Sequence, residues 1–111
     1  IEGFQDDAPL VNMLALRDEI TEEVDRHALD GIALQTFMSI VDTLGGYTGL
    51  ASALVGENVP IGMESDIHGA ISNIILEKVS FHETPAYLAD ITIRHPDNDN
   101  AVLIWHSGAA L

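Results

Sequence analysis

The chain has 111 residues, 47% of them hydrophobic, which is enough to form a core and argues against intrinsic disorder. Four basic residues stand against eighteen acidic ones, and the net charge of −14 disfavours nucleic acids and membranes as partners. The absence of cysteine excludes disulfides and thiolate metal sites, and a cytoplasmic location is the default expectation. Because the chain does not begin with Met and stops shortly after His106-Ser107-Gly108, we expect a fragment of a larger protein.

Hydrophobic periodicity and chain-breaking residues divide the first eighty residues into alternating helices and strands. The pattern predicts, in chain order, a helix over 8–27, a buried strand over 32–36, a helical turn or loop over 37–44, a small-residue helix over 47–55, a second strand over 59–63 and a helix from about 66 to 79. The last helix has an apolar stripe made of Ile67, Ala70, Ile71, Ile74 and Ile75. This succession of strands and helices indicates a βαβ unit with a parallel sheet.

The pattern changes after Pro85. Residues 86–94 and 101–106 predict two strands, and the turn-rich segment between them predicts a hairpin. We therefore predict an α/β fold, with a βαβ parallel-sheet unit over residues 1–80 and, over 81–111, the hairpin that begins an antiparallel β domain.

Glu64 is the first candidate functional residue. It lies at the carboxyl end of a predicted buried strand and directly before a helix, and ligands bind at this edge of open α/β sheets. A carboxylate at such a place needs a cation or hydrogen-bond donors to compensate its charge. The alternative is that Asp66 caps the helix and that Glu64 is only its partly solvated neighbour.

The predicted hairpin supplies a second group of candidates. With a five-residue loop, Asp90 lies opposite His106, and their Cβ atoms are about 5 Å apart, so that both side chains can reach one cation. A register slip of one residue would turn His106 to the other face of the hairpin. Ligands of this kind, without sulfur, favour a hard or borderline ion, and Mn²⁺ is the natural choice. The alternative is an ordinary hydrogen bond between Asp90 and His106.

Three segments together resemble the family of L-fucose isomerase-like and L-arabinose isomerase proteins. Met63-Glu64-Ser65-Asp66 and the helix after it resemble the Glu-Gly-Asp motif of that family. Pro85 to Asp90 resembles the strand on which the family places a second acidic ligand, and Trp105-His106-Ser107-Gly108 resembles its downstream histidine segment. The order and spacing of the three segments agree over roughly residues 30–111.

The resemblance implies a metal-dependent aldose–ketose isomerase that uses Mn²⁺ and an enediol intermediate. Carried over to this chain, it implies Glu64 and Asp90 as acidic metal ligands and acid/base catalysts, and His106 as a metal or substrate ligand. It also implies a homo-oligomer, commonly a trimer or a hexamer. The residues that we expect to line the sugar pocket are Gln35, Thr36, His68 and Trp105.

Two departures from the family pattern concern the backbone and the substrate. Ser65 replaces the usual glycine, and Leu34-Gln35-Thr36-Phe37 stands where many fucose isomerase-like proteins have a Lys-Cys-Trp type segment. Three alternatives therefore remain beside the isomerase. They are a non-catalytic domain for sugar binding, metal binding or assembly; a metal-dependent hydrolase that activates water with the same ligands; and a structural domain in which Asp90 and His106 only bond to each other.

Overall fold

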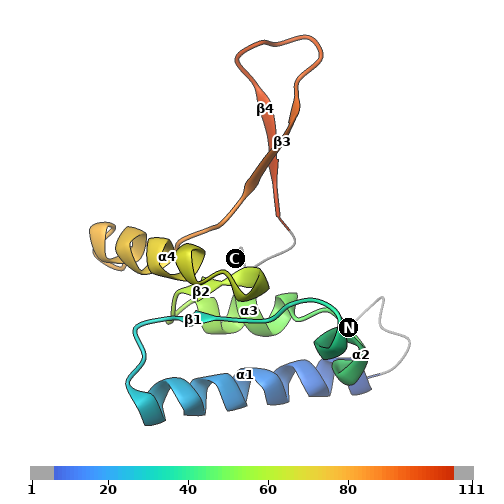
Figure 1. Ribbon diagram of the computed structural model, residues 1–111, viewed down its shortest axis with the longest axis vertical. Helices are drawn as coiled ribbons and strands as arrows, with labels where there is room; N and C mark the ends of the chain where they lie inside the picture. Colours follow the sequence, from blue (N-terminus) through green and yellow to red (C-terminus); the bar gives the residue numbers. More distant parts are fainter. Residues whose placement is uncertain (1–6, 107–111) are drawn as a thin grey trace.

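The computed structural model describes residues 7–106 (Figure 1). Its elements, in chain order, are α1 (Ala8–His27), β1 (Ile32–Ala33), α2 (Ser39–Leu44), α3 (Gly49–Gly56), β2 (Ile61–Gly62), the 3-10 turn η1 (Met63–Ser65), α4 (Ile67–Val79), β3 (Asp90–Arg94) and β4 (Val102–Trp105). β1 pairs with β2 in parallel, and β3 pairs with β4 in an antiparallel hairpin. The predicted α/β class, a parallel unit followed by a hairpin, is confirmed.

Helix α1 has the bounds that the sequence pattern predicts. Pro9 lies in its first turn, where the missing N–H costs no helical hydrogen bond, and Met13, Ile20 and Val24 are buried along one face. The helix ends at Ala28, which adopts a left-handed conformation with φ 48°. The backbone N–H of Ala28 then satisfies carbonyl groups of the last turn, so the helix ends just before the predicted break.

The parallel strand pair is shorter than predicted. Ile32 lies opposite Ile61, and each strand has only two residues. β2 is buried as predicted, but β1 is not, because Ala33 is exposed and Ile32 is only half-buried. The chain leaves the sheet early at Gly62, where α4 crosses the strand. A Cβ on Gly62 would lie 2.4 Å from the backbone oxygen of Asp66, so this close approach requires glycine.

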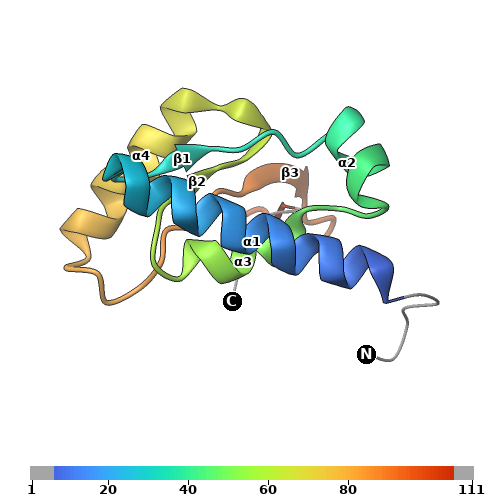
Figure 2. The same ribbon diagram turned by 90° about the horizontal axis from the view of Figure 1, so that it is seen from below.

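The core lies between the strand pair and the helices α1 and α3. Its buried members are Ile20, Val24, Val55, Ile61 and Met63. Figures 1 and 2 show α1 and α3 on one side of the strand pair and α4 on the other. Since only 2% of Met63 is exposed, the core holds the start of η1 in place, and the next residue, Glu64, lies at the surface.

Helix α4 presents its predicted apolar stripe mainly to solvent. Ile67 is 65% exposed and Ile75 is 57% exposed, whereas small and polar residues of the helix are buried. The reason is the short strand pair, which offers little surface and approaches α4 closely. Ala70 packs against it, and the Asn73 side chain donates to the Ile61 backbone oxygen at 2.8 Å. The face of α4 that packs on the strand pair therefore consists of small and polar residues, which allow close packing and hydrogen bonding.

The hairpin projects away from the helices and the parallel pair (Figure 1). Near its turn, Arg94 lies opposite Val102, as the five-residue loop predicts. A β-bulge at Thr92 then shifts the register by one residue, so that Asp90 lies opposite Trp105. The predicted pairing of Asp90 with His106 is therefore wrong.

The division of the chain at residue 80 stays a prediction, although α4 ends at Val79 and the hairpin begins ten residues later, at Asp90. Within residues 7–106, no helix combines the length and the apolar character needed to cross a membrane.

Candidate functional site

The carboxyl ends of β1 and β2 bring together two segments that are far apart in the sequence, 34–36 and 64–65. The Leu34 backbone oxygen accepts from the Ser65 N–H at 2.9 Å, and the Ser65 hydroxyl donates to Gln35 Oε1 at 2.8 Å. The backbone N–H of Glu64 donates to Thr36 Oγ1 at 3.2 Å. These bonds place Gln35 and Glu64 at the sheet edge at which ligands bind in α/β folds.

Gln35, Thr36 and Glu64 differ in how accessible they are. Thr36 is 0% exposed, so its hydroxyl positions the Glu64 backbone and does not line a pocket. Gln35 is exposed, and its amide nitrogen donates to the Phe37 backbone oxygen at 3.2 Å. The Glu64 side chain is exposed and therefore reachable by a ligand.

The backbone is strained at this edge, as it is at Phe81 and His82 after α4. Glu64 has φ 61° and Ser65 has φ 60°, so two consecutive non-glycine residues occupy the left-handed region. This conformation costs roughly 1–2 kcal/mol per residue for a side chain with a Cβ. Such strain gathers at functional sites, where it fixes a side chain in a particular direction.

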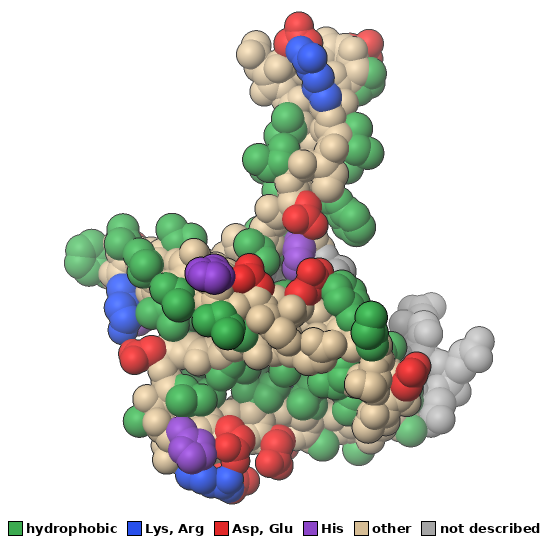
Figure 3. Space-filling view, in the orientation of Figure 1, with side chains coloured by type: hydrophobic (Ala, Val, Ile, Leu, Met, Phe, Trp, Pro, Cys, Tyr) green, Lys and Arg blue, Asp and Glu red, His purple; other side chains and the backbone are tan. Residues whose placement is uncertain are grey.

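The first turn of α4 provides the neighbours of Glu64. Asp66 occupies the N-cap position without a side-chain capping bond, and its carboxylate lies against Gly69. His68, which we expected to line the sugar pocket, is exposed, and its backbone oxygen accepts from the Ser72 hydroxyl. Figure 3 shows acidic side chains and histidines gathered on the face where the hairpin leaves the helices.

At the base of the hairpin, the candidate residues Asp90 and His106 do not lie opposite each other. Asp90 is exposed and opposes Trp105, which is 55% exposed. His106 follows β4 and is half-buried, and its buried Nδ1 has no hydrogen-bond partner within residues 7–106. An unpartnered buried nitrogen is unfavourable, so His106 is suited to a ligand that completes its hydrogen bonding.

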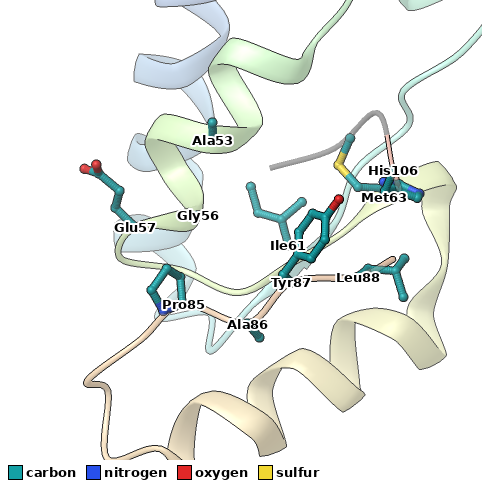
Figure 4. Close-up of a pocket in the computed structure, with 10 residues that line it drawn as sticks. All are labelled: Ala53, Gly56, Glu57, Ile61, Met63, Pro85, Ala86, Tyr87, Leu88 and His106. Atoms are coloured by element: carbon teal, nitrogen blue, oxygen red, sulfur yellow. The ribbon is translucent and has the colours of Figure 1, made fainter. Parts of the chain in front are cut away.

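His106 lines an open pocket of about 590 Å³, counting the part open to solvent (Figure 4). The other lining residues are Ala53, Gly56, Glu57, Ile61, Met63, Pro85, Ala86, Tyr87 and Leu88. Of the predicted ligands only His106 lines the pocket; Glu64 follows the lining residue Met63 in the sequence, and Asp90 comes two residues after the lining residue Leu88. Sequence reasoning missed Tyr87, although an aromatic residue so close to Pro85 and Asp90 was the available signal.

A three-ligand metal centre is not assembled in the described part of the chain. Within residues 7–106, no three His, Asp or Glu side chains lie close enough together to hold a metal ion. Glu64, Asp90 and His106 therefore do not fit the predicted Mn²⁺ site in this arrangement, and Mn²⁺ stays a prediction. What the described residues do provide is two exposed carboxylates, Glu64 and Asp90, and a pocket lined by His106, whose buried Nδ1 has no hydrogen-bond partner among them.

The chain is similar to curated proteins named sulfoquinovose isomerase. The protein from Alkalicoccus urumqiensis is 31% identical over 106 residues, which cover 95% of this chain and 24% of that protein. Those from Priestia aryabhattai and Priestia megaterium are 32% identical over 92 residues, covering 81% of this chain and 20% of each protein. The chain thus spans no more than about a quarter of the length of these relatives.

No family model matches the chain, and no solved structure gives a significant match. The names of the relatives support similarity to sugar isomerases in general. They do not point to L-fucose or L-arabinose isomerase in particular.

Proposed function

We propose that this chain is part of a sugar isomerase that interconverts an aldose and its ketose. The observation that carries the proposal is that 95% of the chain aligns with a relative named sulfoquinovose isomerase. The exposed Glu64 carboxylate at a strand end supports it, because this reaction needs groups that move protons.

The chemistry assigns roles to the two carboxylates. One takes the proton from C2 of the open-chain aldose while the O1 carbonyl oxygen gains a proton, which gives an enediol. The enediol then loses the O2 proton and receives a proton at C1, which leaves the ketose carbonyl at C2. Glu64 and Asp90 are the proposed base and acid, and both are exposed to substrate. No step is assigned to a metal, since the described residues do not form its ligand set.

The substrate class follows from the relatives and from the basic residues. The name of the relatives makes a sulfonated sugar the first substrate to test. Each Lys and Arg of the chain already pairs with a carboxylate: Arg17 with Asp18, Arg26 with Glu22, Lys78 with Asp30 and Arg94 with Asp99. Since a sulfonate is best bound by such cations, neutral aldoses belong in the same assay.

The test is proton exchange with solvent. The protein that contains residues 1–111 is incubated in D₂O with sulfoquinovose, L-fucose or L-arabinose, and the sugars are followed by NMR. We expect a ketose to appear, with deuterium at C1 of the ketose and at C2 of the recovered aldose. Light scattering of the same sample tests the proposed trimer or hexamer. Sugars that keep all their C–H protons with every divalent metal added would contradict the isomerase.

One alternative is favoured by a specific observation. Because no three metal-binding side chains gather within residues 7–106, a non-catalytic sugar-binding or assembly domain is the second candidate. This alternative predicts that the protein binds the sugar or associates with other copies, and that no deuterium is incorporated into the sugar.

A further inference from the structure

The pocket lined by Met63 and His106 has other lining residues that the isomerase chemistry leaves unused. Its walls are mostly apolar, and Tyr87 contributes an aromatic ring that is 42% exposed. Figure 4 shows this ring between β2 and α3, with its hydroxyl on the side of Met63 and His106, while the Glu57 carboxylate points away from them. The pocket therefore combines a ring face and an apolar floor with His106, whose buried Nδ1 has no hydrogen-bond partner among the described residues.

This combination fits a sugar. A sugar ring or chain has a C–H face that packs on an aromatic ring and hydroxyl groups that need hydrogen-bond partners. We infer that this pocket is a substrate subsite, in which Tyr87 packs against the C–H face of the sugar and His106 Nδ1 bonds to one of its hydroxyls. The inference rests on the proposed function, because it assigns this pocket to the part of the sugar remote from C1 and C2, the atoms on which the carboxylates are proposed to act.

The charge of the lining decides which part of the sugar enters. Glu57 is the only acidic residue among the lining residues that the structure describes, and none of them is Lys or Arg. The described lining therefore offers no cationic side chain of Lys or Arg to a sulfonate, and an uncharged, hydroxylated part of the substrate is favoured. Trp105 does not line this pocket, so Tyr87 replaces it as the aromatic residue expected to contact the sugar.

The experiment compares Tyr87→Leu, Tyr87→Phe and His106→Leu in the protein that contains this chain. Binding is measured by calorimetry with sulfoquinovose and with D-glucose, and turnover by deuterium exchange. Tyr87→Leu and His106→Leu should each raise Kd and KM about tenfold, with kcat within about twofold. Tyr87→Phe keeps the ring and should stay close to wild type. The loss in Tyr87→Leu should be equal for both sugars, since the sulfonate lies outside the pocket.

Phe81→Leu is the matched control, because Phe81 is 83% exposed and does not line the pocket. A Kd and KM that remain unchanged in Tyr87→Leu overturn the subsite even when the wild type is an active isomerase. Sugar binding that depends on Tyr87 without deuterium exchange supports the subsite and overturns the isomerase. A wild type that neither binds nor converts these sugars overturns both. Circular dichroism and melting curves confirm that each variant is folded.

Discussion

Glu64 and Thr36 are joined by a hydrogen bond of 3.2 Å, from the backbone N–H of Glu64 to the buried Thr36 hydroxyl. Thr36 follows β1 and Glu64 follows β2, so the bond ties the ends of the two strands together. Because each strand has only two residues, the ladder itself contributes few hydrogen bonds. The direction of the Glu64 side chain therefore depends on a side-chain contact that lies outside the sheet.

Replacing Thr36 by valine tests this dependence. Valine has the same shape but no acceptor, so the Glu64 N–H loses its partner, and we expect the free energy of unfolding to fall by about 1–3 kcal/mol. Urea denaturation measures the change. Thr36→Ser keeps the hydroxyl and loses one methyl group, which should cost only about 1 kcal/mol. A valine variant at least as stable as the serine variant would contradict the positioning role of the hydroxyl.

The left-handed backbone at Ser65 leads to a stabilising substitution. At φ 60° the Cβ of Ser65 causes steric strain with the backbone, and Ser65→Gly removes this strain. The substitution also removes the 2.8 Å hydrogen bond from the Ser65 hydroxyl to Gln35. This bond is exposed and contributes little to stability. We expect Ser65→Gly to raise the free energy of unfolding by about 0.5–1 kcal/mol, measured by urea denaturation.

Ser72 provides the matched control for that substitution. It lies inside α4 with helical backbone angles, so Ser72→Gly should lower stability by about 0.5–1 kcal/mol. If glycine destabilises the protein at both positions, the backbone angles at Ser65 are not the cause of strain.

The sequence predicted the helices better than the strands, and the difference has a physical origin. The bounds of α1 depend only on residues within or next to the helix: its apolar residues, Pro9 and the turn at its end. Such local features can be read from the sequence. The length and burial of β1 depend on how closely α4 approaches Gly62, which is a tertiary contact. The stripe of α4 shows the same limit, because periodicity identifies an apolar face but not the surface that covers it.

The candidate site was predictable in part for the same reason. Glu64 follows a strand and precedes a helix, and both facts are local, so its place at the sheet edge could be read from the sequence. The register of Asp90 could not be, because the bulge at Thr92 inserts one unpaired residue that leaves no clear mark in the sequence. Tyr87 was missed because its segment was expected to be a strand, whereas β3 begins only at Asp90.

The two carboxylates proposed to move protons are tested by removing their charge. Glu64→Gln and Asp90→Asn keep the size of each side chain, and we expect kcat for aldose–ketose conversion to fall by about 10²- to 10⁴-fold in each variant. KM should change much less, because the carboxylates act on the reacting C–H bonds. Rates are measured by deuterium incorporation from D₂O.

Glu83→Gln and Asp97→Asn serve as controls, since both residues are exposed acids and neither lines the pocket. These controls lower the net negative charge by the same amount and should leave kcat unchanged. A comparable loss in the controls would assign the effect to overall charge and not to Glu64 or Asp90.

His106 and Asp90 are separated by the shifted register, and this changes the expectation for Mn²⁺. Asp90 opposes Trp105, and no three-ligand group forms within residues 7–106. His106→Leu should therefore leave the affinity for Mn²⁺ unchanged within about twofold, measured by the EPR signal of the free ion. Losing a residue that supports a metal site lowers affinity by about 10-fold or more.

His95→Leu, a substitution of an exposed histidine near the hairpin turn, controls for unspecific binding. A tenfold weaker affinity in His106→Leu alone would return this residue to the metal site and remove it from the sugar pocket.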